Sequence, residues 1–461
     1  MGAELDRKTR NIILILFLIG VFMGSLDTGI IGPVLPSIEQ AYNLTSREAS
    51  WVYTLFVITF MIGSPIMAKF SDFYGRRKIF ILDTVLFALG SALIAFSFNI
   101  ELIYLGRIIQ GLGCGGLFPV ASAFIGDAFP LDERGKALGL LGSVFGISAI
   151  GGPLLGAALI PYGWNLCFTI NIPISIILVV LAYYILPGPE SDEKLVIDYL
   201  GVIFLILLSF LLAFGLNQID SNNFVQSVLS LNVLPYLLAF IILLVIFIKV
   251  EKNAQESIIP IQMFQNTEIT ITCIETFCYG IIFSAVIFIP SFVILSMGFN
   301  DQIASLMLIP LLGANAITAP IIGRFLDKTG TRILMNVGTL FITFGLVSII
   351  LYPSNTILFI IASCLIGIGF ITIIGAPVRY IVLCEAKPNE RGAGQAIVNM
   401  FSSIGQLIGG ALMGGVIASF SGILGYRISL IIAAVISVIA FSFSLKLKSR
   451  DEQRKSMMEN Q

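Results

Sequence analysis

The chain has 461 residues, of which 57% are hydrophobic and only 11% are charged, with a net charge of −1 and a mean hydropathy of +0.99. About a quarter of the residues of a soluble protein are charged, so this composition excludes an ordinary soluble domain and predicts an integral membrane protein. No histidine is present, which excludes histidine-dependent triads, metal sites and proton relays, so any proton handling must use carboxylates. The cations gather at the membrane edges rather than on a basic face, so nucleic acid is not an expected partner.

Fourteen apolar runs are long enough to cross a bilayer, which takes about 20 helical residues. They cover approximately residues 11–36, 48–68, 79–98, 102–126, 136–160, 166–186, 198–217, 231–249, 268–295, 302–322, 333–352, 356–380, 393–419 and 427–446. With the N-terminus inside, most of the lysines and arginines fall in the inner segments, as the positive-inside rule requires. The sequence therefore predicts an all-α, multi-pass protein of the cell membrane with both termini in the cytoplasm.

Spans 1 and 4 each carry a charge inside the hydrocarbon, where charges are costly and mark functional candidates. Asp27 lies roughly nine residues from the outer end of span 1, and Arg107 roughly five from the outer end of span 4. These similar depths predict that the two side chains meet. Beside Arg107 the carboxyl stays ionised, whereas alone in a dry site it takes up a proton. We favour a proton carrier over the alternative, a static pair that joins two helices.

The loop between spans 2 and 3, Ala68–Lys78, holds four cations and one acid in eleven residues. A similar pattern returns at residues 323–332, and Asp72 and Asp327 are each followed three residues later by a glycine. The positive-inside rule explains the cations of these loops, but it does not explain the recurring Asp-x-x-Gly. We therefore predict a duplicated membrane unit.

A second pair of matches, Arg134-Gly135 and Arg391-Gly392, recurs at nearly the same offset. If six spans form the first unit and two further spans are inserted after it, the second unit begins at the distance along the chain that separates the matching motifs. The predicted division is a six-helix bundle over 1–186, a linker with two inserted helices over 187–262, a six-helix bundle over 263–448 and a cytoplasmic tail over 449–461.

Span 5 contains the small residues Gly146, Gly151, Gly152 and Gly156, with Pro153 among them. Small residues at this spacing let another helix approach closely, and the proline permits a bend. The stripe is either a contact that closes and reopens during alternating access or ordinary helix packing.

Three further charges lie within spans. Asp83, one turn inside span 3, is predicted to be a structural partner of Arg76 or Lys78. Glu275 in span 9 either binds a cation or a second proton, or lies at a helix end that reaches the inner membrane surface. Arg379, near the inner end of span 12, can extend its side chain to that surface, and we assign it no role.

Span 13 carries a polar stripe in which the spacing places all members on one helical face. The stripe consists of Gln395, Asn399, Ser402 and Gln406. It either lines a substrate cavity or joins helices by hydrogen bonds. The six cysteines form no CxxC pair and are expected to be packing residues, so we predict no metal and no cofactor apart from protons as the coupling ion.

These residues resemble the major facilitator superfamily, and within it the fourteen-helix drug:proton antiporter branch. The resemblance covers essentially all spans. Its motifs are Leu26-Asp27-Thr28 with Pro33 and Leu35-Pro36 in span 1, the loop Ala68–Lys78, Arg107-Ile-Ile-Gln-Gly111 in span 4, Gly152-Pro153-Leu-Leu-Gly156 in span 5 and Asn171-Ile-Pro173 in span 6. Ala68 and Ala157 depart from the family pattern, each standing where the signature has a glycine.

The resemblance implies roles for individual residues. Asp27 and Arg107 are expected to couple protons, and we add Glu275 to them because of its place in span 9 of the second unit, not because of the resemblance. A charge network at the inner end, which holds the outward-facing state, is expected to comprise Asp72, Gly75, Arg76, Asp127 and Asp327. The antiporter signature of helix 5 is Gly152, Pro153 and Gly156. The expected substrate cavity includes Gln110, Asn171, Gln395, Asn399 and Gln406.

The function that follows is proton-coupled export of amphipathic or cationic small molecules by a monomer surrounded by membrane lipids, as in multidrug efflux and antibiotic resistance. No phosphate-binding GxxxxGK[ST] stretch appears, so ATP is not the expected energy source. A membrane enzyme is disfavoured because the chain lacks histidines and a soluble domain. The alternative that stays open is a dedicated proton-coupled exporter or importer of a single metabolite or lipid.

Overall fold

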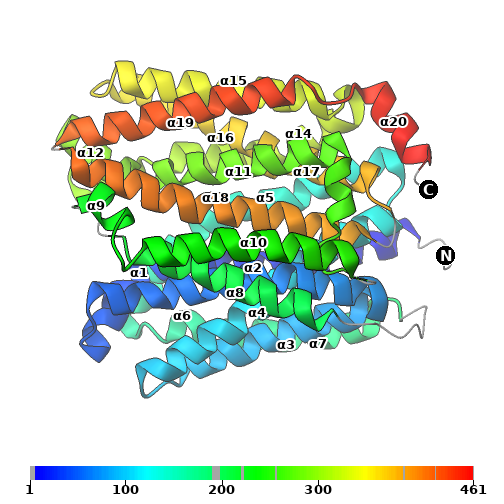
Figure 1. The fold of residues 1–461 in the computed structure, drawn as a ribbon. Coiled ribbons are helices and arrows are strands. Elements are labelled where there is room, and N and C mark those ends of the chain that lie inside the picture. The colour runs from blue at the N-terminus through cyan, green and yellow to red at the C-terminus, as the bar shows by residue number, and fades with distance from the viewer. Residues whose placement is uncertain are drawn as a thin grey trace.

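The computed structural model describes residues 6–188, 198–219, 223–254, 257–387, 390–420 and 422–459. Within these ranges every regular element is a helix, and fourteen helical segments are long and apolar enough to cross a membrane. This confirms the predicted fold class and number of spans. Figure 1 shows the long helices running side by side in one bundle.

The helices fall into two groups, which we call the N-half and the C-half, joined by two inserted spans. The N-half contains α1 (Arg7–Tyr42), α2 (Ser46–Tyr74), α3 (Arg76–Ala95), α4 (Ile100–Ala128), α5 (Leu131–Leu159), α6 (Leu166–Thr169) and α7 (Asn171–Ile185). The inserted segment contains α8 (Tyr199–Asn217), α9 (Phe224–Val228) and α10 (Leu234–Asn253). The C-half contains α11 (Thr267–Ile287), α12 (Ile289–Met297), α13 (Asp301–Leu306), α14 (Ile309–Thr329), α15 (Thr331–Leu351), α16 (Thr356–Ile374), α17 (Ala376–Glu385), α18 (Arg391–Ser419) and α19 (Ile423–Ser444), and α20 (Arg450–Glu459) follows it.

Local sequence explains where several of these helices begin. The Asp6 carboxylate accepts a hydrogen bond from the backbone N–H of Thr9 and caps α1. Thr45 and Glu48 form a capping box at the start of α2, which satisfies two backbone donors that the first turn leaves free. The apolar runs then continue each helix, because a helix bonds all its backbone groups internally and tolerates hydrocarbon.

Two spans are interrupted. The run predicted as one span over 268–295 is two helices, because α11 ends at Ile287 and α12 begins anew with Pro290 in its first turn. Proline has no N–H to continue the hydrogen-bond ladder. Span 12 is likewise divided between α16 and α17 at Gly375, and Pro377 follows the break. Such breaks are tolerated within a membrane where protein or a cavity surrounds them.

Both ends of the described chain lie at the same end of the bundle, which we call the terminal end (Figure 1). The turns that link α2 to α3 and α14 to α15 each rest on one glycine. Gly75 has a φ of 88° and Gly330 a φ of 80°, a backbone conformation that other residues rarely adopt. The recurring Asp-x-x-Gly of the sequence therefore has a backbone cause, since both reversals need the same glycine.

Buried apolar side chains join the two halves at the terminal end. One cluster contains residues of α1, α4 and α5 together with Leu326, Tyr380 and Leu383 of the C-half. Two other clusters lie toward the opposite, far end, and each belongs to one half alone, one over residues 26–168 and the other over 279–434. The halves therefore share a core near the termini and have separate cores at the far end.

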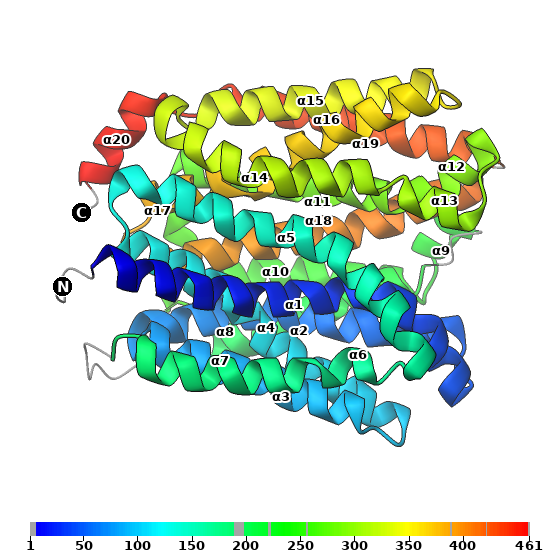
Figure 2. The same ribbon diagram turned by 180° about the vertical axis from the view of Figure 1, so that it is seen from behind.

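Two helix pairs bring the halves together. Helix α5 packs along α14 (Figure 2), and α2 packs along α18. A Cβ atom added at Gly139 would lie 2.9 Å from the Gly323 Cα, so this crossing depends on glycine on both helices. The inserted helices α8 and α10 pack against each other, and α8 contacts both α2 and α18, where it covers one side of the seam between the halves (Figure 1).

Candidate functional site

A buried ion pair lies inside the N-half. Asp27 Oδ2 on α1 lies 2.6 Å from Arg107 Nη1 on α4, and both side chains are fully buried. The guanidinium also donates through Nε to the Val52 carbonyl on α2 at 2.9 Å and lies 4.2 Å from the centre of the Phe56 ring. The predicted meeting of the two charges across the bundle is therefore present.

Neutral side chains complete the environment of this pair. Gln110 Nε2 donates to Asp27 Oδ1 at 2.9 Å and to Ser91 Oγ at 2.9 Å, while its Oε1 accepts from Arg107 Nη1 at 2.7 Å. Asn171 Nδ2 on α7 lies 3.4 Å from Asp27 Oδ1. Gln110 and Asn171 thus surround the aspartate, and charge-assisted hydrogen bonds of this kind are the stronger ones in proteins.

The small residues of α5 serve two different contacts. Gly152 packs on α1, where an added Cβ would lie 2.6 Å from the Gly29 carbonyl carbon, and Gly156 packs on Pro33. Both contacts stay within the N-half, two and six residues beyond Asp27. Gly146, in contrast, approaches Ala316 of α14 in the C-half. Only the first part of the stripe therefore lies where the halves meet.

A charge network joins four helices at the terminal end, and we call it the latch network. Arg76 on α3 forms an ion pair with Asp72 of α2 and lies with Nη2 3.1 Å from Asp127 Oδ2 at the end of α4. Arg391 Nη1 at the start of α18 lies 3.0 Å from Asp127 Oδ1 and donates to the Gly126 carbonyl at 3.2 Å. Asp127 therefore connects the two halves.

The start of α18 also lies directly on Asp72. A Cβ added at Gly392 would lie 2.9 Å from Asp72 Oδ1, so the carboxylate faces the positive end of the helix dipole. The role of Arg391 was not predicted, although its recurrence with Arg134 was the available signal. The side chain of Asp327, the matching aspartate of the second unit, lies outside the described part of the structure.

Glu275 of α11 is fully buried, and the backbone of Ser444, at the end of α19, lies beside its carboxylate. The alternative that its side chain reaches the membrane surface is therefore wrong. Glu275 lies in the C-half, apart from the cluster around Asp27.

Two predicted placements of charges are corrected. Asp83 is not a partner of Arg76 or Lys78. Its carboxylate is fully buried against Gly116 of α4, without a hydrogen-bond partner among the described residues, because the phase of α3 directs it inward. Arg379 does not extend to the membrane surface. It is 1% exposed and points into the seam between the halves.

Part of the stripe on α18 surrounds Arg379. Its Nη1 donates to the Gln395 carbonyl at 3.1 Å, and its Nη2 donates to Asn399 Oδ1 at 2.6 Å. Gln406 lies further along α18 and donates to Ser402 Oγ at 3.3 Å. The stripe is thus divided between a cluster around Arg379 and a separate contact.

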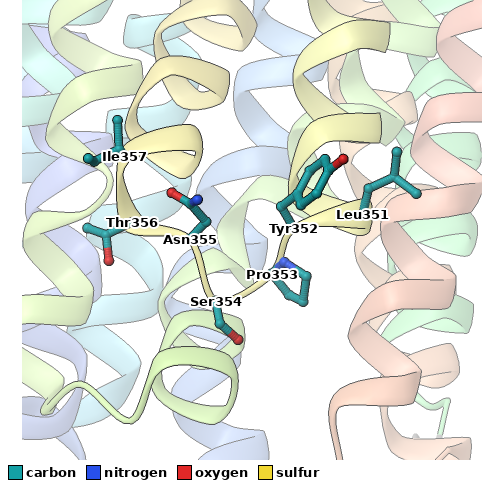
Figure 3. Close-up of a pocket in the computed structure, with 7 residues that line it drawn as sticks. All are labelled: Leu351, Tyr352, Pro353, Ser354, Asn355, Thr356 and Ile357. Atoms are coloured by element: carbon teal, nitrogen blue, oxygen red, sulfur yellow. The ribbon is translucent and has the colours of Figure 1, made fainter.

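An open hollow at the far end is unrelated to these charges. Figure 3 shows it on the loop between α15 and α16, lined by residues 351–357 alone. A hollow made by one short loop brings no convergent polar groups from different helices, as ligand sites in bundles do. The candidate site is therefore the interior of the bundle around Asp27 and along the seam.

Comparison with known proteins gives consistent similarities. The model of the Major Facilitator Superfamily matches residues 17–382 and 272–460. The uncharacterized MFS-type transporter YfiU of Bacillus subtilis is 32% identical, covering 90% of this chain and 81% of its own. Multidrug resistance protein 3 of the same organism is 30% identical, covering 87% of this chain and 78% of its own. The riboflavin transporter RibZ of Clostridioides difficile is 26% identical, covering 88% of this chain and 87% of its own.

Solved structures show the same fold. The proton:xylose symporter XylE superposes with a TM-score of 0.67 over 96% of this chain and 98% of its own, at 16% sequence identity. At this identity the likeness concerns the arrangement of helices alone.

The ion pair predicts a specific pattern of stability. Arg107→Gln leaves the Asp27 carboxylate buried without its cation, and we expect a loss of about 3–5 kcal/mol in the free energy of unfolding. The double variant Asp27→Asn/Arg107→Gln should recover much of this loss, because neither charge remains. Melting temperatures of the purified proteins in detergent check this, with Arg324→Gln on the exposed face of α14 as control. A double variant no more stable than Arg107→Gln would contradict the role of charge balance.

The latch network predicts a conformational shift. Arg391→Gln removes a charge-assisted hydrogen bond between the halves, so the terminal end should open more often. We expect maleimide labelling of Cys384, which is buried in the shared core, to become roughly tenfold faster. Cys167, in the far-end core of the N-half, serves as the internal reference. An equal rise at Cys167 would indicate general loosening, and an unchanged rate at Cys384 would count against the latch.

Proposed function

The chain belongs to the major facilitator superfamily of membrane transporters, and from this premise we propose that it exports amphipathic small molecules from the cell in exchange for protons. As a member of this family it is a transporter and not an enzyme. The observation that carries the proposal is the buried pair of Asp27 and Arg107, which offers one titratable carboxyl group to a moving bundle. A relative named for multidrug resistance supports the choice of export.

The distribution of contacts supports alternating access. The halves share a core and the latch network at the terminal end, while their far-end cores are separate. Rocking one half against the other would break the first set of contacts and bring the far ends together. With the termini in the cytoplasm, as the charge bias predicts, this conformation faces outward. The latch network of Asp72, Arg76, Asp127 and Arg391 then stabilises the outward-facing state, with the Gly75 turn placing Arg76.

Protons supply the driving force in this proposal. A proton that binds Asp27 weakens its ion pair and frees Arg107 for its neutral acceptors, Gln110 and the Val52 carbonyl. Returning the proton to the other side restores the pair. One elementary charge crossing the membrane is worth about 2.3 kcal/mol per 100 mV, which is sufficient to drive uphill export of a small molecule. Glu275 is the proposed second titratable group, because it is buried without a cation given beside it in the described part of the chain.

A dedicated transporter of one metabolite is the second candidate. It is favoured by the relative named as a riboflavin transporter, which matches most of the chain. The two candidates differ in range. A multidrug exporter dissipates a proton gradient when any of several chemically unrelated compounds is added. A dedicated transporter does so with one compound only. Purified protein in proteoliposomes, tested with cationic dyes, tetracyclines and flavins, separates them.

Asp27→Asn tests the proposed coupling. We expect it to abolish substrate-dependent release of a proton gradient in everted vesicles, because the variant side chain cannot carry a proton, while the protein is still found in the membrane. Glu101→Gln, which neutralises an exposed acid in the first turn of α4, is the matched control and should transport normally. Full proton-driven transport by Asp27→Asn would remove this residue from the mechanism.

A further inference from the structure

Arg379 on α17 is a buried cation, and the groups that it contacts among the described residues are all neutral. Its guanidinium donates to the Gln395 carbonyl and to Asn399 Oδ1, and its Cζ lies 4.4 Å from the centre of the Phe118 ring. The Nε has no partner among the described residues. Amides and a ring satisfy part of its hydrogen-bonding capacity, but they leave a full positive charge in the middle of the bundle.

Three other buried or half-buried arginines of the bundle interior differ in this respect. Arg107 pairs with Asp27, Arg76 with Asp72, and Arg391 with Asp127. No ion pair between Arg379 and a carboxylate is found in the described part of the chain. An unpaired charge in a dry site costs several kcal/mol, so a residue of this kind is expected to have a function. An anion from outside the chain would balance it.

The position of Arg379 makes it a site that opens and closes. It lies in the first turns of α17, just after the helix break at Gly375, where the positive end of the helix dipole also favours an anion. One group that covers it, the Phe118 ring, comes from the opposite half, and the Asn399 amide that accepts from it touches that half in turn. Phe118 belongs to α4, and Asn399 is held by Ser64 of α2. Separation of the halves at the terminal end would therefore uncover the guanidinium.

We propose that Arg379 binds the acidic group, a carboxylate or a phosphate ester, of an amphipathic substrate when the terminal end is open. This inference rests on the proposed function as an exporter. A guanidinium presents a planar fork of donors that matches such groups, and the amides of Gln395 and Asn399 can then turn to the remaining acceptors. The apolar body of the substrate would take the place of Phe118. Substrates with an acidic group are therefore preferred over the same molecules without one.

The test compares rhodamine B, which carries a free carboxylate, with its ethyl ester, which has the same ring system but no acid. Fluorescence anisotropy of each dye with purified protein in phosphatidylcholine nanodiscs gives the two Kd values without any proton gradient. We expect the wild type to bind the carboxylate form roughly tenfold more tightly, as for a hydrogen bond between charged groups. Arg379→Gln should bring the ratio close to one, and Arg379→Lys should give an intermediate ratio.

Two controls keep the result interpretable. Arg324→Gln, on the exposed face of α14, should keep the wild-type ratio. Arg379→Gln should not lower the melting temperature, because it removes a buried charge that has no acid beside it, so a loss of binding is not a loss of folding. Arg391→Gln, which favours the open terminal end, should tighten binding of rhodamine B severalfold, and this gain should vanish in the double variant with Arg379→Gln.

Three outcomes would overturn the proposal. A wild type that binds both dyes equally well would refute it. A tenfold preference for the carboxylate form that is retained in Arg379→Gln would refute it as well. If phosphatidylglycerol in the nanodiscs weakens rhodamine B binding to the wild type but not to Arg379→Gln, the anion is a lipid headgroup instead. Because binding is measured without a gradient, full proton-driven transport by Asp27→Asn would count against the proposed coupling and leave this result intact.

Discussion

The need to neutralise charge inside hydrocarbon shapes both halves of this protein, and they meet it differently. In the N-half, Asp27 and Arg107 neutralise each other, and α1, α2, α4 and α7 all contribute contacts to that pair. In the C-half, Glu275 and Arg379 are both buried, yet neither has an ion-pair partner given within the described residues. A proton and a bound anion are the two ways in which such charges become neutral. The charges of Asp27 and Arg107 therefore balance each other, whereas Glu275 and Arg379 of the C-half, like Asp83 of the N-half, have no opposite charge beside them among the described residues.

The same chain duplication that sets the topology also sets how the terminal end closes. Gly75 and Gly330 reverse the chain at equivalent positions with similar backbone angles. The first reversal places Arg76 against Asp127, and Asp127 in turn holds Arg391 of the C-half. Close packing of α5 on α14 adds a crossing without bulky side chains. The ion pairs and the close glycine contacts thus join the two halves at the terminal end, and no comparable shared core joins them at the far end among the described residues.

Sequence predicted the elements of this fold better than the directions of individual side chains. Apolar run length and loop charge fix how many helices cross and how deep a residue lies along each, so the spans and the meeting of Asp27 with Arg107 were found. The sequence does not determine in the same way which side of a helix faces the bundle. Lipid and bundle interior are both apolar, so hydrophobicity does not distinguish the two sides. Asp83 and Arg379 were therefore misplaced. The contact of Arg391 with Asp127 joins residues distant in the chain, and only the repeat hinted at it.

Helix α4 passes all three charged sites. Arg107, Phe118 and Asp127 lie along it, so the ion pair, the cover of Arg379 and the latch network span about 30 Å of a single helix. On the opposite side, α18 carries Arg391 together with the acceptors of the Arg379 guanidinium. A displacement of α4 relative to α18 must therefore break the contact of Asp127 with Arg391 and uncover Arg379 in the same movement. Under the proposed mechanism, α4 is the element through which protonation of Asp27 would act on the terminal end.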